Sequence, residues 1–149
     1  MPQIPGLRSC YDKTGRLVYF GRMLDKIRLH AAGQLPADYH SNLGSGFDGR
    51  CCQFLGVAYA DLTARTLEGG TDEEVLAWAH ERGGARSDDQ CMIFSNFLMK
   101  RGWRDEASAT LRQRTTEYGL VGCPIETFFD LNEYDEGRDP VGTQAWSKV

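Results

Sequence analysis

The segment GGTDEEVLAWAHERGG, residues 69–84, carries a complete set of helix start and stop signals. Thr71 is followed three residues later by Glu74, which is the spacing of a capping box, and acidic residues fill the first turn. Gly83 and Gly84 then end the segment. We therefore predict a helix between Thr71 and Gly83, and the same rules indicate helices elsewhere in the chain.

The segment SDDQCMIFSNFLMKRG, residues 87–102, repeats this pattern with Ser87 and Gln90 as its capping box. Its apolar residues surround much of the helix, which predicts a central position. Further helices are expected over residues 61–70, with Leu62 and Leu67 facing inward, and over residues 104–120. Residues 125–134 are expected to form a short helix or a turn. We expect four aromatic residues to lie in the hydrophobic core: Trp78, Phe94, Phe97 and Trp103.

The sequence predicts an all-α fold, with one compact domain of six to eight short helices over residues 1–149 and a polar, frayed tail after residue 137. Only RLVYF, residues 16–20, resembles a strand. A chain of 149 residues is long enough for one domain core, and 41% hydrophobic with 26% charged residues is ordinary for a soluble globular protein. No apolar run is long enough to span a membrane.

Charge is distributed unevenly along the chain. Residues 1–52 contain seven Lys and Arg against four Asp and Glu, a balance of +3, whereas residues 53–149 contain ten against seventeen, a balance of −7. A net charge of −4 disfavours nucleic acid as a partner. The start MPQIPGL has no secretion signal, and five cysteines are an odd number, so we expect reduced thiols in a cytoplasm.

The charged segment GRMLDKIRLH, residues 21–30, is the best candidate for a functional site. It lies in a predicted helix over Gly21–Ala32. Arg22 and Asp25 lie three residues apart, away from the main apolar face, with an aliphatic residue one turn before them and another one turn after. This stripe predicts that the helix is covered on two sides and that its charges are shielded from water.

Shielded cations need negative partners, because burying an unpaired charge is costly. Asp25 can neutralise only one of Arg22, Lys26 and Arg28 well. Two interpretations stay open: acidic side chains from the rear of the chain pair with these cations, or the cations bind a carboxylate or phosphate ligand.

Other motifs lack the context that their chemistry needs. GSGFDG, residues 44–49, has the glycine spacing of a dinucleotide site, but no buried strand precedes it, so a turn that leads into a short helix is expected. DLNEYDEGRD, residues 130–139, lacks the oxygen ligand and the Gly of a calcium loop at its fifth and sixth positions. Cysteine and histidine spacings give no zinc site, and we expect no metal and no cofactor.

Three runs together resemble the bacterial domain of unknown function family 5069: residues 6–40, residues 47–57 and residues 67–79. The resemblance covers residues 4–138. It implies that the charged helix is a family feature, and it names no activity. The residues that carry it are Arg8, Ser9, Arg22, Asp25, Lys26, Arg28, Gly33, Tyr39 and Gly69 to Glu74.

Two positions depart from the pattern of the resemblance. Cys10 stands where a Pro often follows Arg-Ser, and Ala58 stands where an acidic residue often begins a helix. Ala58 cannot act as an N-cap, which should cost that helix about 1 kcal/mol.

We expect a non-catalytic binding or interaction domain whose polar pocket takes a small anion or an acidic partner segment. The alternative is a small enzyme in which Lys26 works with Tyr39 or His40 in acid–base chemistry. The residues expected to bind the ligand are Arg8, Arg22, Asp25, Lys26, Arg28 and Tyr39.

Overall fold

The computed structural model describes residues 3–148, which form eight α-helices, two short 3₁₀ helices and one small hairpin. This is the all-α fold that the sequence predicted. The hairpin joins β1 (Lys13–Thr14) to β2 (Leu17–Val18), and the 3₁₀ helices are η1 (Ala37–Asn42) and η2 (Ala145–Lys148). The α-helices are α1 (Phe20–Ala31), α2 (Phe47–Leu55), α3 (Tyr59–Leu67), α4 (Asp72–Gly83), α5 (Asp88–Lys100), α6 (Ser108–Glu117), α7 (Phe128–Asp135) and α8 (Pro140–Thr143).

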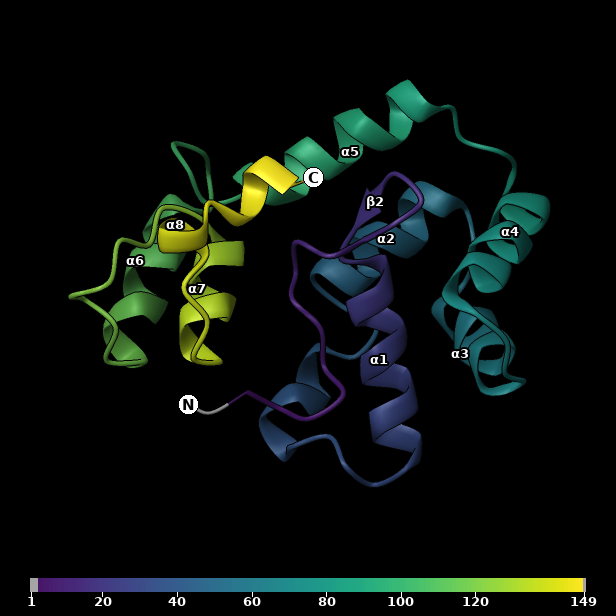
Figure 1. Cartoon of the computed structure of the whole chain (residues 1–149), viewed down its shortest axis with the longest axis horizontal. Coiled ribbons are helices and arrows are strands. Elements are labelled where there is room, and N and C mark those ends of the chain that lie inside the picture. The colour runs from purple at the N-terminus through teal and green to yellow at the C-terminus, as the bar shows by residue number, and fades with distance from the viewer. Residues whose placement is uncertain (1–2, 149) are drawn as a thin grey trace.

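Helix α1 lies near the centre, and the other helices form groups on either side of it (Figure 1). Helices α3 and α4 lie on one side, and α6, α7 and α8 lie on the other (Figure 1). Helix α5 crosses one end of the molecule and connects the two groups, packing against β2 and α7. The N-terminal and C-terminal groups of helices therefore meet around α1.

The main hydrophobic core surrounds the apolar face of α1. Phe20, Met23 and Leu24 are fully buried in one cluster with Leu62 of α3 and Phe129 of α7. Burial of each such side chain stabilises the fold by about 1.5–3 kcal/mol. The core thus fixes α1 and with it the charged side chains on its other faces.

The helix start signals in the sequence predict the observed helices well. Thr71 and Glu74 form the expected capping box of α4, and Ser87 and Gln90 form that of α5. Ala58 precedes α3 without a side-chain cap. Local capping signals therefore located the middle helices correctly.

Four expectations about burial are wrong: those for α5, Phe97, Leu67 and Trp103. Helix α5 is not covered on all sides, because it crosses one end of the molecule, and Ile93 and Phe97 are 64% and 40% exposed. Leu67, expected to face inward, is 51% exposed at the end of α3, and Trp103, expected in the core, is also exposed. Leu62 is buried as predicted.

The segment after Gly137, expected to be a frayed tail, contains α8 and η2. Asp139 caps α8 by accepting a hydrogen bond from the Gly142 amide over 2.9 Å. Pro140 occupies the first turn, where its missing amide hydrogen costs nothing, and it is buried. A side-chain cap and a favourable proline thus order this short segment.

Helix α1 begins at Phe20, one residue earlier than predicted, because Tyr19 turns the chain out of the hairpin. Tyr19 adopts a left-handed backbone conformation, with φ of 71°, which is strained for a residue that is not glycine. Its ring packs against Phe47 and Phe129, with centroid distances of 5.5 and 6.1 Å. This turn directs the Tyr19 hydroxyl toward the charged residues of α1.

Candidate functional site

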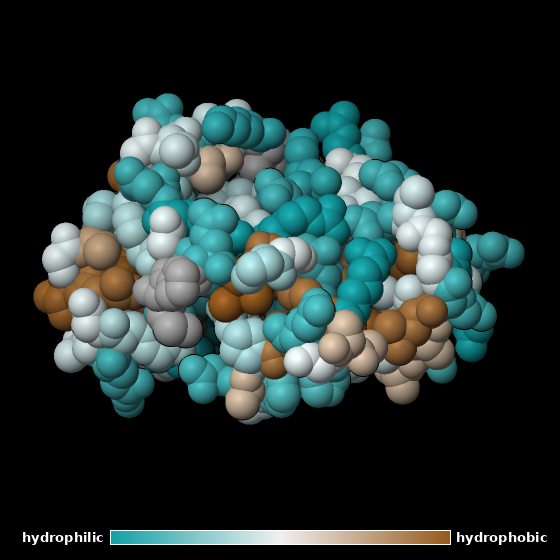
Figure 2. All heavy atoms as spheres, turned by 60° about the horizontal axis from the view of Figure 1, so that its bottom comes forward, coloured by the Kyte–Doolittle hydropathy of each residue, from teal (hydrophilic) through white to brown (hydrophobic). Residues whose placement is uncertain are grey.

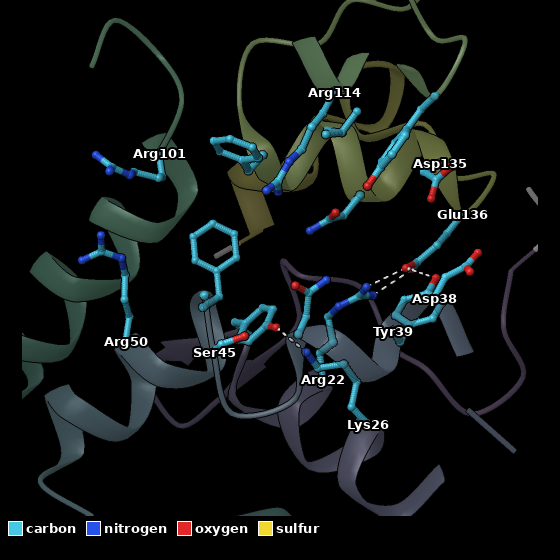
Figure 3. Close-up of a pocket in the computed structure, with 18 residues that line it drawn as sticks. Arg22, Lys26, Asp38, Tyr39, Ser45, Arg50, Arg101, Arg114, Asp135 and Glu136 are labelled. Carbon is cyan, nitrogen blue, oxygen red and sulfur yellow. Dashed lines mark hydrogen bonds and ion pairs between the residues drawn. The ribbon is translucent and has the colours of Figure 1, made fainter. Parts of the chain in front are cut away.

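A cavity of about 480 Å³ lies between α1, η1 and the start of α2 on one side and α6 and α7 on the other (Figure 3). Arg22, Lys26 and Tyr39, three of the residues predicted to bind a ligand, line it. Phe47 and Phe128 add aromatic surface. A cavity of this size lies in the range of small-molecule sites.

On the face shown in Figure 2, most of the surface is hydrophilic, and hydrophobic residues form several separate groups. This face has no single continuous apolar area of the kind that marks a large protein interface. The cavity is therefore the feature from which we build the candidate site.

Arg22 is 3% exposed and forms a bidentate ion pair with Glu136. Its Nη1 donates to Oε1 over 2.8 Å, and its Nη2 donates to Oε2 over 2.6 Å. Nη1 also donates to the carbonyl oxygen of Arg8 over 2.9 Å. This end of the guanidinium is fully occupied by protein acceptors.

The other edge of the Arg22 guanidinium has no acceptor among residues 3–148. A guanidinium has five N–H donors, and only three of those of Arg22 have protein partners. The Nε hydrogen and the second Nη2 hydrogen form the remaining edge, which has the geometry that binds a carboxylate or phosphate with two hydrogen bonds. Arg22 Nε is not among the fully buried side-chain atoms of residues 3–148 that lack a partner, so this edge is open to water, which an anion entering the cavity would displace.

Glu136 accepts hydrogen bonds from Arg22, from the Tyr39 hydroxyl over 2.8 Å and from Arg138. Burial alone would raise the pKa of Glu136, but hydrogen bonds and the charge of Arg22, helped by Tyr39 and Arg138, lower it below its usual value. Glu136 is therefore ionised at neutral pH and already saturated by protein donors.

Lys26 is 4% exposed and shares a second buried cluster with Tyr19 and Asp48. Its Nζ lies 2.8 Å from Asp48 Oδ1 and donates to the Tyr19 hydroxyl over 2.9 Å. The Tyr19 hydroxyl donates to Asp48 Oδ1 over 2.8 Å. Burial and the Asp48 charge raise the pKa of Tyr19 well above its usual value, so it stays a donor.

The ammonium of Lys26 has three donors, and only two have partners among residues 3–148. Its third N–H, like the free edge of Arg22, belongs to a side chain that is more than nine-tenths buried and lines the cavity. The floor of the cavity therefore contains more buried donors than the described protein acceptors use.

Three arginines that sequence reasoning missed also line the cavity: Arg50, Arg101 and Arg114 (Figure 3). Arg50 and Arg114 are exposed, and neither has a carboxylate within 4.0 Å in the part of the chain that is described. Arg101 forms an ion pair with Asp105, with 3.4 Å between Arg101 Nη1 and Asp105 Oδ2. They come from three separate helical segments and have no shared spacing, so no local pattern could have identified them as a group.

Two carboxylates, Asp38 and Asp135, lie on the side of the cavity opposite Arg50 and Arg101 (Figure 3). Burial raises the pKa of Asp135, and the negative charges of Glu136 and Asp38 raise it further. Neither Asp38 nor Asp135 forms an ion pair within residues 3–148. The cavity therefore has a cationic side and an anionic side.

The remaining predicted ligand residues do not line this cavity. Arg8 donates to Asp25 from Nε and Nη2, both over 2.9 Å, and also pairs with Asp72. Arg28 Nη2 donates to Asp72 Oδ1 over 2.8 Å, and Arg28 Nη1 lies 3.6 Å from Asp25 Oδ1. These two arginines and two aspartates form a separate network in which their charges balance.

The two side chains named as acid–base partners for Lys26 have other contacts. The Tyr39 hydroxyl donates to Glu136, and His40 Nε2 lies 2.9 Å from the carbonyl oxygen of Leu35. The His40 ring packs against the His30 ring, with 4.6 Å between the ring centroids. The titratable groups within hydrogen-bond distance of Lys26 are instead Tyr19 and Asp48.

One family model, described as Domain of unknown function (DUF5069), matches residues 4–138. The matched range contains the whole of the cavity lining. No curated protein matches the chain. None of the helices among residues 3–148 has the length and apolar character to cross a membrane.

Proposed function

We propose that this chain, which belongs to the family of unknown function DUF5069, is a non-catalytic binding domain whose cavity takes a small organic anion. The observation that carries this proposal is the free edge of Arg22. This guanidinium is 3% exposed and held in place by Glu136, and its other edge has no described protein acceptor, so it offers a carboxylate or phosphate group two fixed donors in place of water.

The charge of the cavity supports the same proposal. Five cations line it, and two of them, Arg50 and Arg114, have no carboxylate within 4.0 Å in the described chain. Glu136 is already saturated by protein donors, which leaves Arg50 and Arg114 to attract an anion and Arg22 and Lys26 to receive it. An anion entering such a cavity replaces water as the acceptor of buried donors.

We propose separate roles for the residues expected from the sequence. Arg22, Lys26 and Tyr39 belong to the cavity, whereas Arg8, Asp25 and Arg28 hold α1 against the start of α4 through Asp72. A carboxylate of an acidic partner segment would suit the same donors. The volume of the cavity, about 480 Å³, lies in the range of small-molecule sites and favours a small molecule over such a segment.

The experiment compares Arg114→Ala with Arg112→Ala by isothermal titration calorimetry, with propyl phosphate and pentanoate as probes. Both arginines are exposed on α6, but only Arg114 lines the cavity. Arg114→Ala should weaken binding about tenfold, since a hydrogen bond to a charged group contributes about 1.5–3 kcal/mol. Arg112→Ala should bind like the wild type. Equal affinities for the two variants, or no binding to the wild type, would contradict the proposal.

The second candidate function is a small enzyme that uses Lys26 for proton transfer. The observation that favours it is the cluster of Lys26 with Tyr19 and Asp48 beside the cavity. NMR spectra of a bound probe, followed for hours, would distinguish the two candidates. New resonances that are absent with a Lys26→Met variant would support the enzyme.

We also propose a bacterial cytoplasm as the setting. The support is the resemblance of the sequence to a bacterial family and the state of its cysteines, all five of which are free thiols. The net charge of −4 supports leaving nucleic acid out of the proposal.

A further inference from the structure

We infer that the ligand is zwitterionic, with an anionic group that meets the cations of the cavity and a protonated amine that meets Asp38 and Asp135. This inference rests on the proposed function and specifies the chemical class of the ligand. It assigns a role to the two carboxylates that the anion site alone leaves unexplained.

The two sides of the cavity carry side chains of opposite charge. Asp38 and Asp135 line it without an ion pair or a side-chain hydrogen bond among residues 3–148. Figure 3 shows them across the cavity from Arg50 and Arg101. A single small molecule with one charge of each sign could satisfy both sides at once.

The acidic pair alone would not identify a ligand. The independent observation is the pair of buried donors in the same cavity, on Arg22 and Lys26, whose side chains are only 4% exposed and whose spare N–H groups lack acceptors in the described chain. The cavity therefore has donors and carboxylates that no protein group among residues 3–148 occupies, and both are within reach of one ligand.

An amine suits the acidic side better than a hydroxyl group does. A hydroxyl donates one hydrogen bond but leaves the repulsion between neighbouring carboxylates unchanged. An ammonium group donates three hydrogen bonds and offsets that repulsion.

Two pairs of compounds of matched shape test the inference. O-Phosphoethanolamine and propyl phosphate differ in having an ammonium or a methyl group at one end. 4-Aminobutanoate and pentanoate differ in the same way and have a carboxylate head. Isothermal titration calorimetry should show that the amine-bearing member of at least one pair binds the wild type about tenfold more tightly.

Asp135→Asn and Asp38→Asn should each reduce that preference to roughly threefold or less, while propyl phosphate and pentanoate keep their affinity. Asp12→Asn serves as the control, because Asp12 is exposed and does not line this cavity. It should leave the preference unchanged. Asn keeps the shape of Asp. A loss of affinity confined to the amine-bearing compounds would therefore show that they bind through the negative charge of the Asp side chain.

Failure of this inference can be told apart from failure of the proposed function. Equal binding within both pairs, or a preference that survives both Asn substitutions, overturns the zwitterionic ligand and leaves the anion cavity intact. If none of the four compounds binds the wild type at millimolar concentration, the proposed function fails and the inference fails with it.

Discussion

Arg22 and Glu136, which are 114 residues apart in the chain, form a bidentate ion pair that joins α1 to the end of α7. Both side chains are almost completely buried. Glu136 also accepts hydrogen bonds from Tyr39 and Arg138. A single carboxylate therefore connects the N-terminal helices to the C-terminal ones beside the cavity.

Arg22→Ala should lower the free energy of unfolding by about 3 kcal/mol or more, because it leaves Glu136 buried without its main partner. Urea denaturation measures this loss. Arg16→Ala is the control, because it breaks an exposed ion pair in which Arg16 Nε lies 4.0 Å from Asp88 Oδ2. That control should cost less than about 1 kcal/mol. Equal losses for the two variants would show that the buried pair has no special role.

Asp72→Asn should reduce stability at neutral pH and have less effect in acid. Burial alone would raise the pKa of Asp72, but hydrogen bonds from Arg28 and Arg8 lower it below its usual value. Stability from a carboxyl group of lowered pKa is present above the unfolded pKa, about 3.9, and disappears as pH falls through the folded pKa.

The measurement for Asp72 is urea denaturation of the wild type and Asp72→Asn at several pH values. The variant should be less stable by roughly 1 kcal/mol at pH 7, since Arg8 and Arg28 are partly exposed. The difference should shrink as the pH falls below about 4. A difference that stays constant with pH would contradict the role given to this carboxylate.

Ala58→Ser should stabilise the protein by about 1 kcal/mol. Ala58 has the extended backbone of an N-cap, with φ of −76° and ψ of 140°, but no side chain that can accept a hydrogen bond from the first turn of α3. Ala60→Ser, inside the same helix and also exposed, should instead lower stability by a few tenths of a kcal/mol. Thermal unfolding of both variants checks the prediction; a loss at Ala58 would contradict it.

Gly83→Ala should destabilise the protein by about 1–3 kcal/mol, because a Cβ atom there would overlap with the carbonyl oxygen of Leu55 at the end of α2. Gly122→Ala is the matched comparison. A Cβ at Gly122 would meet nothing within 4 Å, and its backbone φ is not positive, so this change should stabilise by about 0.4–1 kcal/mol. Unfolding in urea should give opposite signs for the two variants.

The elements that could be predicted from the sequence are those with local signals. The caps at Thr71 and Ser87 located α4 and α5, and the mixed stripe around Arg22 predicted that its charge is shielded. Neighbouring residues contain this information, because capping and helix periodicity act over only a few positions.

The rest depends on contacts that no local pattern encodes. Asp48 and Glu136 are distant in sequence from the cations they meet, and although the sequence allowed acidic partners from the rear of the chain, no local pattern singled out Glu136. Ile93 and Phe97 look like core residues in the sequence, yet α5 has no covering element on that side among residues 3–148. Burial is set by the neighbours that the fold supplies, and periodicity alone does not specify them.

The two edges of the Arg22 guanidinium limit how the ligand preference that we propose can change. One edge closes α1 onto α7, so a substitution at Arg22 alters folding before it alters selectivity. Arg50, Arg114 and Asp38 lie at the exposed margin and have no such duty in the described structure. Substitutions at Arg50, Arg114 or Asp38 can therefore change the ligand that the cavity accepts, whereas Arg22 must be kept for the stability of the fold.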